Sequence, residues 1–266
     1  MTDPAAPTAL PIWPGQDLSD RSKPNLVPYP APADQAGSAP GVIICPGGGY
    51  SKQADHEGAP FARLFNDSGL AAFILNYRTL PERHTDPYAD ACRAVRWVRQ
   101  HAEDYGVDSR RVALMGFSAG GHLVTTVATR GGRLYQDPRD DLADLEARPD
   151  RLIACYPVVS FLEYGHGGSR QNLLADEADD PELRRLYSNH LHVSRDTPET
   201  FLFHTGEDEP VPMQNSLLFA KACADAGVRC EVHIYRDGPH GVGMSKPCPA
   251  QKTWPGLLVD WLQAWV

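Results

Sequence analysis

The segment GFSAGG, residues 116–121, places Ser118 between two glycines directly after the run RRVALM. A Gly-x-Ser-x-Gly motif between a strand and a helix is typical of a nucleophilic serine, because small neighbours permit the sharp turn that exposes Oγ. The backbone N–H of Ala119, at the start of the helix, would then face developing negative charge. We predict Ser118 as a nucleophile; a glycine-rich turn with an incidental serine is the alternative.

A serine hydroxyl needs a base to accept its proton, and the chain offers ten histidines. We predict His240, because it lies in RDGPHGVGM, a glycine-flanked loop between the last candidate strand and the last helix. His122, one turn after the serine, is interpreted as structural. His204 is expected to pack at a strand end, and His56 to lie near the glycine loop and line a pocket.

The third group should be a carboxylate that orients the imidazole ring. The segment HTGEDEPVP, residues 204–212, follows a candidate strand and precedes a helix. We predict that Asp208 has this role, with Glu207 and Glu209 as alternatives. A run of carboxylates in a loop is otherwise typical of a solvated turn.

The segment CPGGGY, residues 45–50, supplies a site for an oxyanion. It follows the first strong strand, and three successive glycines leave backbone N–H groups free to face a tetrahedral intermediate. A phosphate-binding loop is the alternative, but no Gly-Lys-Ser/Thr follows and GxGxxG is absent.

These segments lie in a regular alternation of strand and helix patterns. Such alternation predicts an α/β protein with a mostly parallel central sheet and helices on both faces. Strands are expected at 41–45, 70–77, 110–116, 150–158, 199–206 and 228–237, and helices at 59–69, 86–106, 118–130, 213–227 and 254–266.

Two regions depart from this alternation. Residues 1–40 contain nine prolines and few apolar clusters, which predicts an extended N-terminal arm packed over the surface, with a proline-rich linker as the alternative. Residues 41–266 are predicted to form one domain. Within it, residues 131–199 contain one strand and a polar insertion that we interpret as a lid or binding loop.

The net charge of the chain limits which macromolecules it is expected to bind. A net charge of −9 over 266 residues argues against nucleic acid or an anionic membrane surface, since both require clustered basic residues. No apolar run approaches the ~20 residues of a membrane span, and the N-terminus lacks the pattern of a signal peptide. We therefore expect a cytoplasmic protein whose six dispersed cysteines are mostly buried thiols.

In these segments the chain resembles the α/β-hydrolase superfamily over residues 41–266, with the order Ser118, Asp208, His240 found in that fold. More narrowly it resembles small carboxylesterases grouped with acetyl xylan esterases and feruloyl-esterase-like proteins. The matching segments are PGGGY, LNYRTLP, DACRAVRWVRQHAEDYGVDSRRVALMGFSAGGHL, GSRQNLL, HTGEDEPVPMQNSLLFAKACADAG and DGPHGVG. Pro46 replaces the histidine usual in the HGGG motif of such esterases.

The resemblance implies Ser118 as nucleophile, Asp208 and His240 as its partners, and Gly48, Gly49 and Ala119 as oxyanion donors. It implies no metal and no cofactor. It favours hydrolysis of short acyl esters, acetyl groups on sugars such as xylo-oligosaccharides in particular. An arylformamidase-like or peptidase-like amide hydrolase is the alternative enzyme, and a ligand-binding module on the same fold is the alternative outside catalysis.

A sugar site requires hydrogen-bonding side chains and an aromatic platform in one cleft. Tyr50 follows the oxyanion glycines, and four polar side chains lie in the insertion. We expect a sugar cleft from these residues, or alternatively side chains that pin the insertion to the body of the protein. The residues are Tyr50, His166, Ser169, Arg170 and Asn172. The pair His190 and His192 is a weak metal pattern, interpreted as a solvated face.

Overall fold

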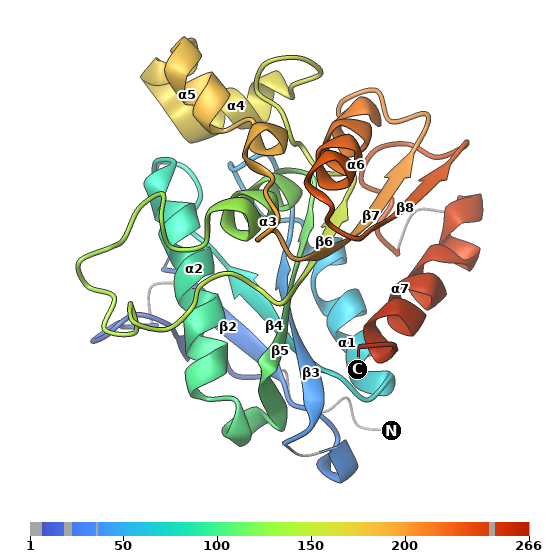
Figure 1. The fold of residues 1–266 in the computed structure, drawn as a ribbon. Helices are drawn as coiled ribbons and strands as arrows, with labels where there is room; N and C mark the ends of the chain where they lie inside the picture. Colours follow the sequence, from blue (N-terminus) through green and yellow to red (C-terminus); the bar gives the residue numbers. More distant parts are fainter. Residues whose placement is uncertain (1–6, 19–22, 36, 245–247, 266) are drawn as a thin grey trace.

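A computed structural model describes residues 7–18, 23–35, 37–244 and 248–265. In these residues one eight-stranded sheet has the order β1-β2-β4-β3-β5-β6-β7-β8 (Figure 1). The β1–β2 and β2–β4 pairs are antiparallel, and all other neighbours are parallel. The strands are β1 (Leu10–Pro11), β2 (Asn25–Tyr29), β3 (Ala39–Cys45), β4 (Ala71–Asn76), β5 (Val107–Phe117), β6 (Arg151–Cys155), β7 (Glu199–Thr205) and β8 (Cys230–Tyr235).

The sheet is parallel at its centre because its middle strands are apolar on both faces. Successive residues Val42, Ile43 and Ile44 of β3 are all fully buried, so neither face of that strand meets water. Two hydrophobic clusters follow from this arrangement, one on each side of the sheet. Parallel strands require crossover connections, and the helices that supply them cover both faces.

Helices α2 (Thr85–Gln100), α3 (Ala119–Arg130) and α6 (Gln214–Ala226) contribute to the first cluster, and α1 (Ala59–Asp67) and α7 (Trp254–Gln263) to the second (Figure 1). Two short helices, α4 (Gly167–Leu174) and α5 (Pro181–Leu186), lie above the carboxyl ends of the strands. The 3₁₀ helices are η1 (Ala33–Gln35), η2 (Asp55–Glu57), η3 (Glu103–Tyr105), η4 (Ala175–Glu177), η5 (Asn189–His192) and η6 (Pro249–Lys252).

The N-terminal region is more than an arm over the surface. Strand β2 extends the sheet beside β4, and β1 pairs with the start of β2. Leu26 of β2 is completely buried. The segments β1 and β2 are therefore strands of the sheet and not an extended arm packed over the surface, while residues 1–6, 19–22 and 36 of the predicted arm lie outside the described residues.

The segment predicted as a lid divides into two parts. Before β6, Asp140 accepts hydrogen bonds of 2.6 and 2.5 Å from Arg93 and Arg96 of α2, so this part packs along α2. After β6, residues 156–198 carry α4 and α5 over the strand ends (Figure 1). Only the second part is placed where a binding loop is expected.

All six cysteines are free; Cys45, Cys92, Cys155 and Cys223 are buried, whereas Cys230 and Cys248 are half-buried. In the part of the chain that the structure describes, none of the helices combines the length and the apolar character that a membrane span requires.

Candidate active site

Ser118 lies in the sharp turn between β5 and α3, with φ 53° and ψ −115°. Such backbone strain costs about 1–3 kcal/mol and persists only where neighbours enforce it. A Cβ on Gly116 would lie 2.2 Å from the carbonyl oxygen of Gly120, and a Cβ on Gly120 would lie 2.1 Å from that of Cys45. Both glycines are therefore required for helix α3 to begin this close to the sheet.

Three loops bring a serine, a histidine and a carboxylate into one line. The hydroxyl of Ser118, after β5, donates to Nε2 of His240, after β8, over 2.8 Å. Nδ1–H of His240 donates to Oδ2 of Asp208, after β7, over 2.6 Å. Because the carboxylate holds the proton on Nδ1, Nε2 is left to accept the serine proton.

Asp208 has a completely buried carboxylate that is paired on several sides. Burial alone would raise its pKa, but hydrogen bonds from His204 and His240, and one from the backbone N–H of Val211, hold the pKa below its ordinary value. The Val211 bond is 2.9 Å long and His204 Nε2 lies 3.3 Å away. Asp208 is therefore an ionised acceptor at neutral pH.

The carboxylates of Glu207 and Glu209, on either side of Asp208, are both exposed. Oε2 of Glu207 accepts a 2.8 Å hydrogen bond from the backbone N–H of Gly238. Glu207 and Glu209 line a cavity of about 480 Å³ beside His240, with Pro210 and Pro239. The carboxylate in contact with the imidazole is that of Asp208.

The glycine loop after β3 adopts backbone angles that side chains rarely permit. Gly48 has φ 129° and Gly49 has φ 65°, and a Cβ on Gly48 would lie 2.3 Å from the Lys52 carbonyl oxygen. Among the described residues, the backbone N–H groups of Gly48, Gly49 and Ala119 donate to no other protein group. That of Ala119 is at the first turn of α3, where a helix leaves N–H groups unpaired.

Two of the predicted substrate contacts are buried in the protein. Tyr50 is 2% exposed, and its hydroxyl donates to Nδ1 of His122 over 2.8 Å. His122 is fully buried, and burial lowers its pKa to about 4, so it is a neutral structural group as expected. Ser169 is fully buried and its hydroxyl bonds Nδ1 of His166 over 2.8 Å. The hydroxyl groups of Tyr50 and Ser169 are therefore buried and bonded to other protein groups, and we do not retain these residues as substrate contacts.

His166 is half-buried at the start of α4, where Nδ1 accepts the N–H of Ser169 over 3.1 Å. Burial lowers its pKa, the charge of His240 lowers it further, and the carboxylate of Asp208 opposes both effects. His166 thus lies within electrostatic range of the His240–Asp208 pair. Because Nδ1 is an acceptor, the neutral ring carries its proton on Nε2.

Asn172 and Arg170 contact the protein rather than open solvent alone. Nδ2 of Asn172 donates to the carbonyl oxygen of Gly49 over 2.8 Å, so α4 is attached to the glycine loop. Arg170 lies 3.3 Å from the exposed carboxylate of Asp179. These contacts favour the alternative in which such side chains pin the insertion to the body.

We expect Asn172→Ala to lower kcat by roughly tenfold on both an acetylated xylo-oligosaccharide and p-nitrophenyl acetate, because a loosened glycine loop affects every substrate. Gln171→Ala is the matched control, since Gln171 is an exposed amide on the same helix and its Nε2 donates to the Ala175 carbonyl of that same segment rather than to the glycine loop. A loss confined to the oligosaccharide would instead show that Asn172 binds sugar.

Two buried residues beside the site carry no signal in the sequence pattern. Glu57 is 2% exposed and accepts from the backbone N–H of Gly47 over 2.7 Å and from the hydroxyl of Tyr156 over 2.8 Å. In the sequence, Glu57 has the pattern of a carboxylate that stabilises the start of the next helix. Tyr156 follows a strand and has the pattern of an ordinary core residue, so neither residue is predicted to support the site.

His204 and His56, the other histidines near the site, have structural partners. His204 is fully buried on β7 and contacts Ser216, Val211 and Asp208. Nε2 of His56 donates to the carbonyl oxygen of Gly241 over 3.1 Å. No group of three or more His, Cys, Asp or Glu side chains in the described ranges is arranged to hold a metal ion, and this includes His190 and His192.

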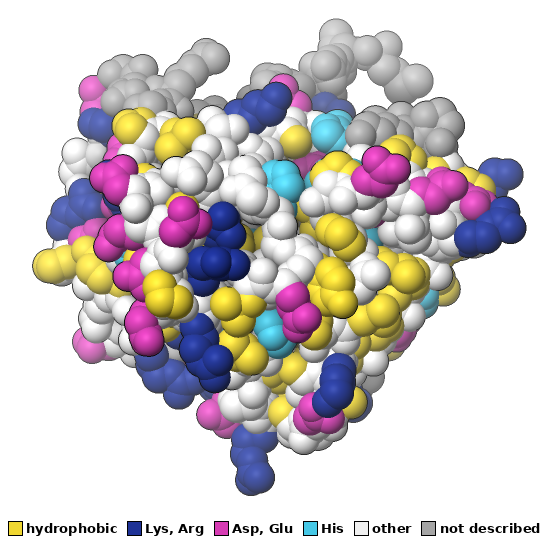
Figure 2. Space-filling view, turned by 90° about the horizontal axis from the view of Figure 1, so that it is seen from above, with side chains coloured by type: hydrophobic (Ala, Val, Ile, Leu, Met, Phe, Trp, Pro, Cys, Tyr) yellow, Lys and Arg dark blue, Asp and Glu magenta, His cyan; other side chains and the backbone are white. Residues whose placement is uncertain are grey.

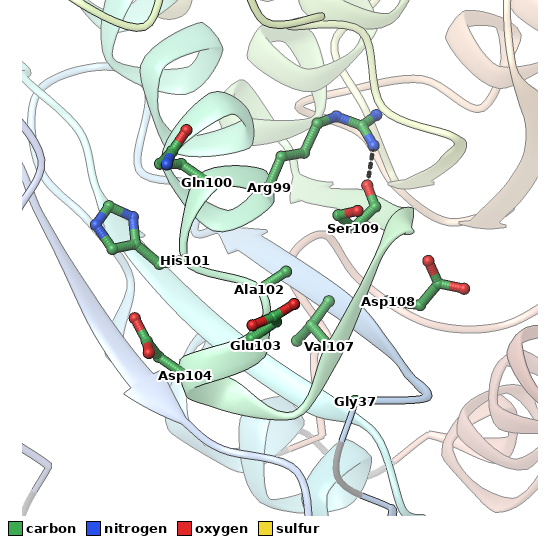
Figure 3. A pocket seen from close by; sticks show the side chains of 10 residues that line it. All are labelled: Gly37, Arg99, Gln100, His101, Ala102, Glu103, Asp104, Val107, Asp108 and Ser109. Atoms are coloured by element: carbon green, nitrogen blue, oxygen red, sulfur yellow. Dashed lines mark hydrogen bonds between the residues drawn. The ribbon is translucent and has the colours of Figure 1, made fainter.

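A cavity of about 330 Å³ lies at the opposite end of the sheet, where β5 begins (Figure 3). Two of its lining side chains are paired with protein, since Arg99 bonds the Ser109 carbonyl and the Asp150 carboxylate, and His101 bonds the Trp97 carbonyl. It contains none of the groups that meet at Ser118.

A mostly parallel sheet covered on both faces, with a serine in the strand–helix turn of β5 and an acid and a histidine after β7 and β8, defines an α/β hydrolase. A sequence model of the BD-FAE family matches residues 29–223, and the chain belongs to this family.

Named relatives and solved structures agree with this assignment. The chain is 34% identical over 232 residues to an acetylxylan esterase of Xylanibacter ruminicola, covering 85% of this chain and 45% of that protein. It is 35% identical over 209 residues to endo-1,4-beta-xylanase B of Butyrivibrio fibrisolvens, covering 76% of this chain and 32% of that protein. The chain thus spans less than half the length of these curated relatives.

The structure of an acetyl ester-xyloside bifunctional hydrolase from Caldicellulosiruptor lactoaceticus superposes with a TM-score of 0.87 at 39% identity, covering 98% of both chains.

Proposed function

We propose that this protein is a serine esterase that hydrolyses short acyl esters, acetyl esters on xylo-oligosaccharides in particular. The observation that carries the proposal is the hydrogen-bonded line from Ser118 through His240 to Asp208, at 2.8 and 2.6 Å. Distances of this kind are those at which a base accepts a serine proton.

In the proposed mechanism Nε2 of His240 accepts the hydroxyl proton as Oγ of Ser118 attacks the ester carbonyl. The imidazolium ion that forms is stabilised by the ionised Asp208. Collapse of the tetrahedral intermediate breaks the bond to the alcohol, which takes the proton from Nε2. A water molecule, deprotonated by His240, then attacks the acyl-enzyme. Collapse of the second tetrahedral intermediate breaks the bond to Oγ of Ser118, which takes the proton back from Nε2, and the acid is released.

The oxyanion of each tetrahedral intermediate would be held by backbone N–H groups of Gly48, Gly49 and Ala119. These groups have no other described acceptor, so they cost no existing hydrogen bond when they bind the oxyanion. The start of helix α3 adds its positive dipole end at Ala119.

The named relatives support the choice of substrate, because they include an acetylxylan esterase and an acetyl ester-xyloside hydrolase. We propose that His166 contacts the alcohol of the substrate, since it is half-buried at the start of α4, above the carboxyl ends of the strands, and keeps a donor on Nε2. An amide hydrolase would use the same atoms, and a ligand-binding module would need none of the proton transfer.

The deciding experiment compares acetylated xylo-oligosaccharides, p-nitrophenyl acetate, an aryl formamide and a peptide amide, each with and without a serine-directed phosphonate. We expect release of acetate from the first two and inhibition by the phosphonate. Faster cleavage of the formamide or the amide would establish the amide hydrolase, and no turnover with tight sugar binding would establish a binding module.

Activity should fall as the acyl chain lengthens. Figure 2 views the molecule from above, over the carboxyl ends of the strands, and shows hydrophobic side chains interrupted by histidine, acidic and basic ones. Such a mixed face lacks the continuous apolar surface that docks on lipid. We expect kcat/KM to decrease from acetyl and butyryl to octanoyl p-nitrophenyl esters; a maximum at octanoyl, or activation by an oil–water interface, contradicts this.

A further inference from the structure

The segment η2 places two consecutive side chains, His56 and Glu57, against the loops that carry the site. Neither belongs to the proposed reaction. The carboxylate of Glu57 is almost completely buried, and each of its oxygens accepts a hydrogen bond from a different loop. A buried carboxylate is costly unless it is well paired, so this arrangement requires an explanation.

The first contact of Glu57 is with the glycine loop. Its Oε2 accepts the backbone N–H of Gly47 over 2.7 Å, and the Gly47 carbonyl in turn accepts the N–H of Ala54 over 3.0 Å. Gly47 is so close to the nucleophile turn that an added Cβ would lie 3.0 Å from Cβ of Ser118. The position of Gly47 therefore sets the position of Gly48 and Gly49 relative to the serine.

The second contact reaches the histidine loop through Tyr156. The tyrosine hydroxyl donates to Oε1 of Glu57 over 2.8 Å and accepts the N–H of Gly243 over 3.2 Å. Its ring meets the ring of His240 edge-on, with centroids 5.3 Å apart and an interplanar angle of 73°. Burial, and then the charge of Glu57, raise the pKa of Tyr156 well above its ordinary value, so it remains a donor.

The neighbour of Glu57 holds the same loop at a second point. His56 donates from Nε2 to the Gly241 carbonyl over 3.1 Å, one residue after His240. A Cβ on Gly243 would lie 2.9 Å from Cδ2 of His56, so the loop lies directly against this ring. The histidine loop is thus held at two points, at Gly241 by His56 and at Gly243 by Glu57 through Tyr156.

We propose that Glu57 is a positioning residue that fixes the oxyanion glycines and the His240 loop relative to each other, with Tyr156 as its link to the histidine. This inference rests on the proposed esterase function. Glu57 does not contact the reacting atoms; it acts by holding two donors, the N–H of Gly47 and the hydroxyl of Tyr156, in fixed positions. Misplacement of catalytic groups by about 1 Å can cost 10²-fold in rate.

The test measures kcat, KM and the pH dependence of kcat/KM on p-nitrophenyl acetate for Glu57→Ala, Glu57→Gln and Tyr156→Phe. We expect Glu57→Ala to lower kcat by about 10²-fold with little change in KM. Glu57→Gln should recover part of the loss, to roughly tenfold below wild type, because the amide oxygen still accepts one of the two donors. Tyr156→Phe should lower kcat and shift the pH profile, since it frees the His240 loop.

Asp140→Asn is the matched control, because Asp140 is also a buried carboxylate but pairs with Arg93 and Arg96 on α2. It should lower the melting temperature and leave kcat and the pH profile unchanged. If Glu57→Ala does not fold, Glu57→Gln and Tyr156→Phe decide the question.

Wild type and Ser118→Ala are measured beside these variants. If wild type is inactive, or Ser118→Ala retains activity, the proposed function fails. If wild type is active and depends on Ser118, but Glu57→Gln and Tyr156→Phe keep the wild-type kcat and pH profile, only the positioning role of Glu57 is overturned.

Discussion

Replacement of Ser118 by alanine is expected to abolish ester hydrolysis while the protein still folds. The substitution removes only Oγ, and loss of the nucleophile in such a site lowers kcat by about 10⁶-fold. The backbone at this position is held by a 3.0 Å hydrogen bond from the Ser118 N–H to the Cys155 carbonyl, which alanine retains. Turnover of p-nitrophenyl acetate and the melting temperature are the two measurements.

Ser118→Gly provides a second test of the same assignment. Glycine adopts φ 53° without the strain that a side chain brings, so this variant should be as inactive as the alanine variant and at least as stable. A serine-directed phosphonate should label wild type and neither variant. Near wild-type hydrolysis by either variant would exclude Ser118 as the nucleophile.

Asp208→Asn should lower kcat by about 10⁴-fold, the loss expected when the imidazole is held in the wrong tautomer. An asparagine amide donates to Nδ1 of His240, which moves the ring proton to Nε2 and prevents it from accepting the proton of Ser118. The Val211 N–H can still bond the amide oxygen, so the loop should keep its shape. The measurement is kcat on the same ester, with circular dichroism to verify folding.

Glu207→Gln is the matched control for Asp208→Asn. Glu207 is the adjacent residue and is exposed, and its carboxylate bonds the Gly238 N–H rather than the imidazole. Activity should change little in this variant, because a glutamine oxygen can still accept that bond. If Glu207→Gln proves inactive and Asp208→Asn active, the acid has been assigned one residue too late.

Helix α4, in the second part of the insertion, contacts the glycine loop that is proposed to bind the oxyanion. Asn172 of α4 donates to the carbonyl oxygen of Gly49, whereas Glu57 of η2 accepts from the N–H of Gly47. The proposed oxyanion loop is therefore held at two points, and preorganised donors of this kind stabilise a transition state without the cost of rearrangement.

The sequence by itself determined the central strands, the crossover helices and the segments that meet after β5, β7 and β8. The reason is that these features are local. Gly116 and Gly120 mark a sharp turn within five residues, and apolar runs such as 41–45 mark buried strands. The order of the segments along a parallel sheet then places Ser118, Asp208 and His240 at its carboxyl edge.

The tertiary structure alone decided the N-terminal strands. Proline in a short run argues against a strand, because it cannot donate to the ladder. Pro28 is nevertheless in β2, opposite Phe73 of β4. Strand β1 pairs only with Asn25 and Leu26, so the other side of Pro28 has no ladder partner that would need its N–H. Such pairing depends on residues far apart in the sequence, which no local pattern records.

The choice among adjacent polar residues was likewise a tertiary matter. Three acidic residues follow β7, and only packing of His204 and Val211 against Asp208 turns that carboxylate toward His240. Tyr50 follows the glycines but points inward to His122, and Glu57 is buried between two loops that are far from each other in sequence. Burial and hydrogen-bond partners are set by the whole fold, and they separate a reacting group from a supporting one.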